Sequence, residues 1–331
     1  MKIKSTILMS LLTLFASEVV FGQEKEEPDF LYEIVREIKH PGYLSFDLVP
    51  IQIGYMSDFV NFEAGGGARI SNYKNKLSAE LNTSFVYANI STNKNQLGYR
   101  SIGTENKKYV NLDATFGFTV KQDKNKKDRV VRLKVKGNTE TVSNMPCTEI
   151  TSYIIRGGFM MNSFQQRGEV PSNDPNGPNG NIFFGSGDNY EMFQTVLSAN
   201  IGFMRKVSVN TFFKTDKYGK INESSDFELY GDILINVGNK FPQFNRLFYE
   251  DETYPNEITS ESAMSAYDQN FVREQFFKLP AGLRIGARQN DYKKSSFFWR
   301  GEIGIYPGTY SNYASSIGLK IGIGYRFQNN F

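Results

Sequence analysis

Residues 317–327 read IGLKIGIGYRF, and this stretch near the carboxyl end of the chain decides the fold class. Its odd-numbered positions are apolar or aromatic, whereas its even-numbered positions are glycine, lysine and arginine. Side chains of a β-strand alternate between two faces, so a period of two predicts a strand with one apolar and one polar face. We therefore expect a last strand over about residues 315–327 that separates an apolar from a polar environment.

The same alternation continues upstream of this stretch. In residues 277–288 the apolar side chains Leu283 and Ile285 oppose Lys278 and Arg284. A strand of a soluble sandwich also alternates, but its polar face seldom carries so much glycine. We expect an all-β fold, an antiparallel transmembrane barrel of about twelve strands, with ten to fourteen admitted. The expected strands span residues 43–55, 62–71, 77–89, 108–120, 128–137, 148–162, 190–205, 207–216, 224–237, 276–288, 294–306 and 315–327.

The count leaves one difficulty in the middle of the chain. With the C-terminus in the periplasm, residues 165–189 become a long periplasmic loop, whereas Arg205-Lys206 becomes a very short external turn. Both lengths fit poorly with short periplasmic turns and longer external loops. Elsewhere the pattern is regular, apart from a phase slip at Val49-Pro50, which predicts a β-bulge.

Composition agrees with a membrane barrel and excludes other classes. The 331 residues include 28 Phe, 19 Tyr and 29 Gly but one Trp, and the mean hydropathy is −0.43. A formal net charge of +3 is too small to indicate nucleic-acid binding. The single cysteine, Cys147, excludes an internal disulfide or a cysteine-based zinc site. We expect aromatic girdles to include Tyr43, Tyr55, Tyr87, Phe118, Phe203, Tyr306 and Phe327.

Three regions follow one another along the chain. Residues 1–22 carry Lys2, Lys4 and a short apolar run, which predicts a signal peptide cleaved after Gly22. Residues 23–42 form a periplasmic segment, in which apolar positions at helical spacing over 29–40 predict a short amphipathic helix. Residues 43–331 form the barrel.

The end of the chain resembles a known assembly signal. Lys320, Gly322, Tyr325 and Phe327 occupy the polar, glycine, hydrophobic and final aromatic positions of the β-signal of bacterial outer-membrane β-barrel proteins. Four residues follow Phe327 in this chain, which departs from that pattern. The resemblance covers architecture and no functional family; the overall composition looks like that of Bacteroidota proteins. It implies an outer-membrane location and recognition by the barrel assembly machinery.

The polar face of the strands predicts the lining of the lumen. Two interpretations stay open: a salt-bridged plug that fills a narrow barrel, or a basic pore that favours anions. Acidic residues such as Asp47 and Glu302 are expected to pair with basic neighbours: Asp47 with Lys320 or Arg326, and Glu302 with Arg284 or Arg288. The predicted lumen-lining residues are Arg132, Lys134, Lys136, Lys278, Arg284, Arg288, Arg300, Glu302, Lys320 and Arg326.

Three functions are compatible with these features. The first is a channel or small-solute transporter with a basic lumen, and the second is a structural or adaptor barrel in an envelope or secretion complex. An outer-membrane enzyme is a weak third, because the one histidine, His40, precedes the first strand. We expect no enzyme activity, catalytic residue, metal, cofactor or nucleic-acid partner. The expected partners are outer-membrane lipid, the barrel assembly machinery and envelope-complex subunits.

Overall fold

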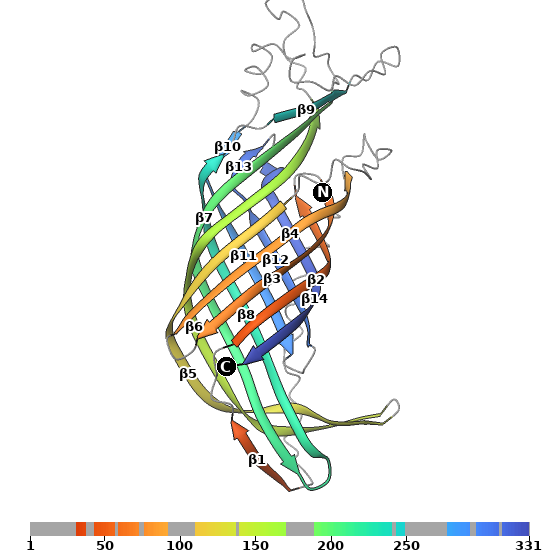
Figure 1. Cartoon of the computed structure of the whole chain (residues 1–331), viewed down its shortest axis with the longest axis vertical. Coiled ribbons are helices and arrows are strands. Elements are labelled where there is room, and N and C mark those ends of the chain that lie inside the picture. Colours follow the sequence, from red (N-terminus) through yellow and green to blue (C-terminus); the bar gives the residue numbers. More distant parts are fainter. Residues whose placement is uncertain are drawn as a thin grey trace, which may run out of the picture.

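The computed structural model has the shape of a tall, tilted barrel with strands projecting from one end (Figure 1). It describes residues 31–37, 43–56, 59–72, 76–91, 110–136, 139–169, 189–239, 243–248, 277–291, 296–310 and 313–330. The signal peptide and His40 lie outside these residues. No helix in the described ranges is both long enough and apolar enough to cross a membrane.

Ten strands close into a ring in which neighbours are antiparallel. Its members, in ring order, are β2 (Tyr43–Met56), β3 (Phe59–Asn72), β4 (Leu77–Ser91), β5 (Val110–Lys136), β6 (Thr139–Glu169), β7 (Asn189–Thr215), β8 (Gly219–Asn239), β11 (Ala281–Asp291), β12 (Ser296–Ile305) and β14 (Ile317–Asn330). The last strand pairs with the first, because β14 aligns with β2 from Gly318↔Met56 to Asn330↔Tyr43. Closure leaves no free edge in the wall of the ring.

The remaining strands are not members of the hydrogen-bonded ring. β1 (Tyr32–Glu37) and β9 (Gln243–Phe248) each pair with β7, and β10 (Phe277–Leu279) pairs with β13 (Gly308–Tyr310) as a separate two-stranded ribbon. The expected β-bulge in the first ring strand is confirmed, since the β2–β3 register shifts between Val49 and Gln52.

The structure corrects the strand count from twelve to ten. Two expected pairs of strands are single long strands: β5 runs through 122–127, and β7 runs through Arg205-Lys206. In β7 the alternation continues through this pair, because Arg205 is exposed and Lys206 is buried. The correction removes the loop difficulty, since the 170–188 connection now starts and ends at the same end of the barrel as 92–109 and 240–276.

The two ends of the barrel differ in the length of their connections. At the end that carries Tyr43 and Asn330, called the terminal end below, consecutive strands are joined by 73–76, 137–138, 216–218 and 292–295. At the opposite end, the mouth, the connections include the much longer 92–109, 170–188 and 240–276.

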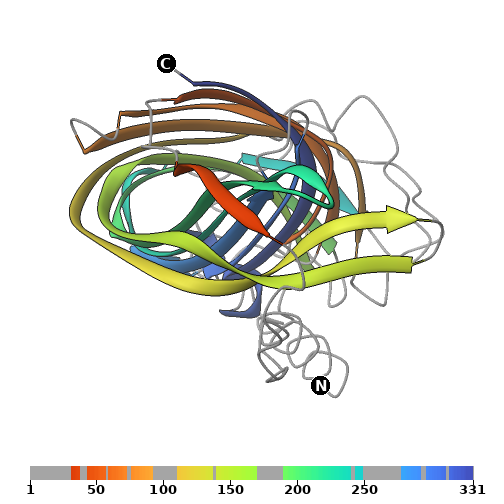
Figure 2. The ribbon, with the colours of Figure 1, turned by 90° about the horizontal axis from the view of Figure 1, so that it is seen from below.

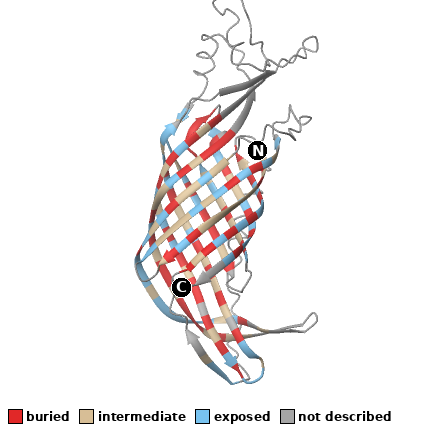
Figure 3. Ribbon diagram, in the orientation of Figure 1, coloured by how far each residue is buried: buried red, intermediate tan, exposed pale blue. Residues whose placement is uncertain are grey.

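The barrel is apolar outside and polar inside, the reverse of a soluble protein. Apolar side chains exposed on the outer wall occur on every ring strand: Phe46, Leu48, Ile51, Ile53, Ile70, Leu81, Phe85, Leu112, Phe116, Ile155, Phe159, Ile201, Phe203, Leu229, Ile233, Ile235, Leu283, Ile285, Phe297, Ile303, Ile321, Ile323 and Phe327. Water would disfavour such a surface by roughly 25 cal/mol for each Å² exposed. Figure 3 shows buried and exposed positions alternating along the strands. Only a hydrocarbon surrounding explains this arrangement.

Two residues expected in the aromatic girdles point inward instead. Tyr43 and Tyr306 are both buried in the barrel; the Tyr43 ring packs against the Lys206 ammonium, 5.1 Å from its centroid. Phe118, Phe203, Tyr87 and Phe327 are exposed on the outside, as predicted.

Four ring strands continue past the terminal end as an extension with its own apolar core. β5 pairs with β4 only as far as Phe118, after which β5 and β6 continue together as a hairpin. β7 and β8 form the second hairpin, and Figure 2 shows the first one swinging away from the ring. The core consists of Val131, Met145, Cys147, Val209, Phe213 and Ile221, with Ile34, Leu133 and Tyr218 packed against it.

The predicted amphipathic helix over 29–40 is wrong where the structure describes it. Residues Tyr32–Glu37 form β1, which pairs with β7 from Thr211 to Thr215, beyond the point at which β6 has left that edge. A register shift between Ile34 and Arg36 explains the misleading pattern, because one extra residue changes a period of two into apparent helical spacing. Tyr32 contacts Phe213 edge to face at 6.1 Å.

Labelling of the single cysteine tests whether the apolar core of this extension is formed. Cys147 is fully buried, and burial raises the pKa of its thiol to about 11. The lower thiolate fraction alone should slow maleimide labelling of the folded protein at pH 8 by roughly 200-fold relative to a free thiol. Urea should restore rapid labelling. Fast labelling of protein that still shows a folded barrel on a heat-modifiability gel would contradict this core.

Candidate functional site

The interior of the barrel holds a dense and balanced set of charges. In the described residues, eight acidic and eight basic side chains are buried in the ring or line its cavity. The acidic ones are Asp47, Glu63, Glu80, Asp113, Asp226, Glu228, Asp232 and Glu302, and the basic ones are Arg69, Arg156, Lys206, Arg284, Arg288, Arg300, Lys320 and Arg326. Equal numbers of each sign do not give the basic lumen that the sequence predicted.

The layer near the terminal end consists of direct ion pairs, some between neighbouring strands and one across the lumen. Arg326 donates two hydrogen bonds of 2.7 Å to Asp47, which decides between the two partners left open for that carboxylate. Arg69 contacts Glu228 at 2.6 Å and Glu80 at 2.8 Å. Because Arg69 and Glu228 lie on strands far apart in the ring, their pair connects opposite walls.

A second layer lies at mid-height and is centred on Arg284. Its guanidinium contacts Asp232 and Asp113, each at 2.7 Å, and Glu302 at 3.5 Å. Tyr230 donates a 2.7 Å hydrogen bond to Glu302, and its ring lies 4.3 Å from the Arg156 guanidinium carbon. Gly286, directly opposite Tyr230 in the β8–β11 register, is needed here, because a Cβ atom would lie 2.2 Å from that ring.

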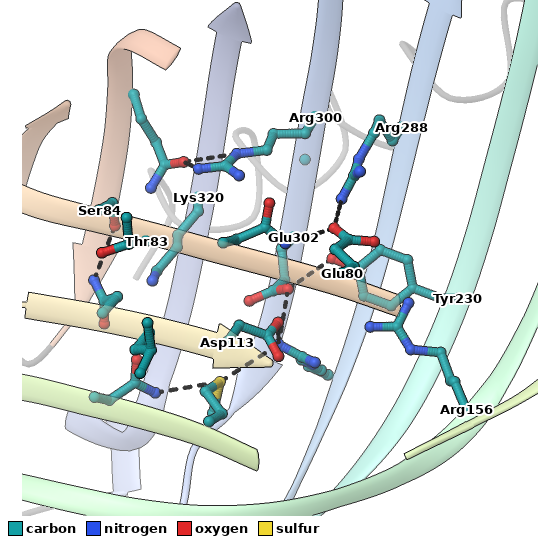
Figure 4. Close-up of a pocket in the computed structure, with 18 residues that line it drawn as sticks. Glu80, Thr83, Ser84, Asp113, Arg156, Tyr230, Arg288, Arg300, Glu302 and Lys320 are labelled. Atoms are coloured by element: carbon teal, nitrogen blue, oxygen red, sulfur yellow. Dashed lines mark hydrogen bonds and ion pairs between the residues drawn. The ribbon is translucent and has the colours of Figure 1, made fainter. Parts of the chain in front are cut away.

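Between the walls at this height lies a cavity of about 70 Å³. Figure 4 shows Arg300, Lys320, Glu302, Glu80, Asp113 and Arg288 converging on it from different strands. A smaller cavity of about 30 Å³ lies toward the terminal end, beside Arg69 and Lys206. A cavity needs about 10–15 Å³ of this kind of volume to hold one water, so these two spaces hold a few waters each.

Near the mouth of the barrel, apolar side chains of the wall and a connecting segment form one buried cluster. The connection between β12 and β14 turns inward, so that Tyr306 and Tyr310 pack against Phe164, Leu234 and other members of one buried cluster. The Tyr310 ring stacks on Phe164 with centroids 5.5 Å apart. We call residues 306–310 the inner plug.

A side chain of the wall fixes the inner plug by pairing with its backbone. The Gln194 amide donates to the Thr309 carbonyl at 2.5 Å and accepts from the Thr309 N–H at 3.1 Å. Tyr306 donates a short hydrogen bond to Glu302, which connects the plug to the charged layer below it. Buried backbone groups that are paired in this way are costly to expose without a replacement partner.

The predicted lumen residues divide into two groups. Arg284, Arg288, Arg300, Glu302, Lys320 and Arg326 line the cavity or are buried in the ring. Lys278 does not join them, because it lies on β10, outside the ring. Arg132, Lys134 and Lys136 lie on the part of β5 that has left the ring.

Sequence reasoning missed several residues of the interior. Arg156, Lys206 and Asp226 are buried and paired, with Lys206 only 2.6 Å from Asp226. Strict alternation along β6, β7 and β8 would have identified them. The inner plug had no such signal, since Pro307-Gly308 reads as an ordinary turn.

The described part of the interior shows no metal centre. Across the part of the chain that the structure describes, no group of three or more histidine, cysteine or acidic side chains is placed to hold a metal ion. Carboxylates such as Asp113, Glu80 and Asp47 form ion pairs with guanidinium groups on other strands, so these pairs link strands of the barrel wall.

A closed antiparallel ring, an apolar outer wall and a charged interior define the class: a membrane-spanning β-barrel. No family model matches the sequence, and no curated protein matches it. Among solved structures, it is similar to an outer-membrane channel from Pseudomonas putida F1, with 10% identity, a TM-score of 0.24 and coverage of 94% of this chain and 100% of that one.

Two further solved structures are similar at the same low level. An anion-selective porin from Comamonas acidovorans gives 8% identity and a TM-score of 0.15, covering 87% of this chain and 100% of that one. OprD from Pseudomonas aeruginosa gives 8% identity and a TM-score of 0.14, covering 92% and 100%. Scores this low carry no argument, so the class rests on the ring, the outer wall and the interior.

Proposed function

We propose that this protein is an outer-membrane barrel of a Gram-negative bacterium that acts as an anchor and adaptor, with a closed lumen. The observation that carries this proposal is the filled interior, with equal numbers of acidic and basic side chains in the described residues and cavities of about 70 and 30 Å³. An open pore needs a continuous water-filled path. Ion pairs such as Arg69–Glu228 and Arg284–Asp113 span that path instead.

The extension at the terminal end supplies the adaptor surface in this proposal. Bacterial barrels have short turns on the periplasmic side and long loops outside, which favours a periplasmic position for the terminal end. Strands β5 and β6 have 27 and 31 residues, whereas about 9–11 residues cross a bilayer. The surplus, held by its own core, would stand in the periplasm, where envelope-complex subunits are found.

Assembly into the membrane belongs to the same proposal. The residues that resemble the β-signal, Lys320, Gly322, Tyr325 and Phe327, lie on β14, the strand that closes the ring against β2. A closing strand at an open seam is a suitable element for the barrel assembly machinery to bind. The expected signal peptide and the Bacteroidota-like composition are consistent with this route.

A specific observation favours a gated channel as the second candidate. The inner plug belongs to a connection and not to the ring wall, so it is able to leave without breaking the ring. Beneath it, the hydrogen bond from Tyr306 to Glu302 links the plug to the central charged layer. A stimulus that removes the plug would also have to rearrange the ion pairs below it.

Conductance in planar bilayers decides between the two candidates. Protein that runs as a folded barrel on a heat-modifiability gel is expected to give no steady current, because charged side chains block the lumen. A general porin reconstituted in the same lipid is the positive control. Stepwise single-channel currents from this protein would contradict the closed barrel and favour the channel.

A further inference from the structure

A row of outward-facing side chains crosses three neighbouring strands near the terminal end of the outer wall. Lys121 on β5 lies opposite Tyr153 on β6, and Tyr153 lies opposite Arg205 on β7. The Lys121 side chain is 66% exposed, and its ammonium lies 5.7 Å from the centroid of the Tyr153 ring. Arg205 is also exposed. The row therefore presents two cations with an aromatic ring between them.

This row lies beside an apolar row of the outer wall, on the side toward the terminal end. The apolar row consists of Phe118, Ile155 and Phe203, which face one another across the same strands and are each about half exposed. The Tyr153 ring stacks on Phe203, with centroids 6.1 Å apart. A change from apolar to aromatic and basic side chains marks the height at which hydrocarbon gives way to lipid headgroups.

Positive charge exceeds negative charge on the strand that continues from this row. Residues 121–129 of β5 contain five basic and two acidic side chains. Glu149 on β6 supplies a third carboxylate, which Lys127 and Arg129 share at 2.7 and 2.8 Å. Five cations therefore meet three carboxylates along this part of the β5–β6 pair.

Two cations beside this stretch increase the excess. Arg205 forms no ion pair with any residue that the structure describes, whereas Lys121 is paired with Asp123 at 3.0 Å. Lys76 is exposed in the turn before β4, where its carbonyl accepts a 2.8 Å hydrogen bond from the Thr119 N–H of β5. It also lacks an ion pair with the described residues. The boundary of the apolar wall is therefore basic on this side of the barrel.

We propose that the row Lys121–Tyr153–Arg205 binds the phosphate of one anionic phospholipid, such as phosphatidylglycerol. Two strand spacings of about 4.8 Å separate the two cations, a span that their long side chains close around one headgroup. The acyl chains lie along the apolar row that contains Phe118 and Phe203, which favours a lipid over an acidic peptide. The choice of a phospholipid rests on the periplasmic position proposed for the terminal end, since phospholipids form that leaflet.

Native mass spectrometry of the detergent-solubilised full chain tests this site. From an equal mixture of phosphatidylglycerol and phosphatidylcholine, the folded wild type is expected to retain at least about tenfold more phosphatidylglycerol. The reason is that each basic residue near an anionic lipid surface contributes roughly fivefold. Replacing both cations, by Lys121→Gln with Arg205→Gln, should lower this preference to less than about twofold.

The matched control is Lys214→Gln with Lys220→Gln, which removes the same charge. These two exposed lysines lie opposite each other in the β7–β8 pair. Lys214 lies roughly 30 Å beyond Arg205 along β7, at about 3.3 Å for each residue. The control should keep the preference of the wild type. A loss as large as that of the site variant would assign the preference to overall charge and overturn the proposal.

Other results also overturn it. Equal retention of the two lipids by the folded wild type does so, as does an unchanged preference in the site variant. Displacement of phosphatidylglycerol by hexaglutamate would identify an acidic-peptide surface instead. If the double variant does not run as a folded barrel, Arg205→Gln alone takes its place, with an expected loss of about fivefold. Ion current is measured separately, so this result and the failure of the closed-barrel proposal remain distinguishable.

Discussion

Replacing Arg284 with leucine is expected to lower the free energy of unfolding by about 3–5 kcal/mol. Arg284 is 1% exposed and holds Asp113 and Asp232 at 2.7 Å each. Without it, among the described residues, Asp113 loses its ion-pair partner and Asp232 keeps Arg156, at 3.1 Å. Breaking a buried ion pair from one side is costly because the remaining charge stays uncompensated.

Urea titration of the protein refolded in detergent micelles measures this loss. Arg205→Leu is the matched control, because Arg205 is exposed on the outer side of β7 and forms none of the interior ion pairs described above. We expect the control to change the stability by less than about 0.5 kcal/mol. Adding Asp113→Asn to Arg284→Leu should recover part of the loss. Equal stability of Arg284→Leu and wild type would show that the charged layer is not rigidly paired.

Replacing Tyr310 with alanine is expected to destabilise the inner plug by about 3–5 kcal/mol, the range for removing a large buried aromatic side chain. Tyr310 is 0% exposed, stacks on Phe164 and donates to the carbonyl oxygens of Tyr306 and Pro307 at 2.9 and 3.2 Å. Removing the ring leaves a cavity within the buried cluster at the mouth, which includes Phe164 and Leu234.

The connection that contains the plug also supplies a matched control. Tyr313 lies three residues further on, at the start of a 3₁₀ turn, and is 74% exposed. Limited proteolysis should cleave Tyr310→Ala near the plug at a much higher rate than Tyr313→Ala or wild type. Tyr310→Phe, which keeps the ring and loses the hydroxyl, should cost only about 1 kcal/mol. Similar cleavage of all variants would contradict an inserted plug.

Comparison of the predicted and observed strands shows where alternation with a period of two is sufficient to identify a strand and where it is not. Alternation identified every ring strand while the wall separated hydrocarbon from the lumen. In residues 121–129, KQDKNKKDR, both faces of β5 meet water, so the apolar face disappears and the segment reads as a turn. The sequence pattern reflects the environment of each strand face. The backbone of β5, by contrast, stays extended both within the ring and beyond it.

The interior shows a similar division. Residue parity alone placed Arg284, Arg288, Glu302 and Arg326 on the polar face, because successive side chains of a strand point to opposite sides. It left the partner of each charge open, since the partners lie on strands as distant as β5 and β11. The balance of charge arose because Arg132, Lys134, Lys136 and Lys278 lie off the ring. Their loss outweighs the two basic residues and one acidic residue that were not counted, Arg156, Lys206 and Asp226.

The sequence by itself therefore determined a barrel with an apolar outside, a polar inside and a last strand at residues 317–327, because these properties are local to each strand. Strand count, ion-pair partners and the inner plug were decided only by the tertiary structure, because they depend on contacts between distant segments. β1 illustrates the reason most clearly: residues with helical spacing form a strand because β7 offers them a free backbone edge.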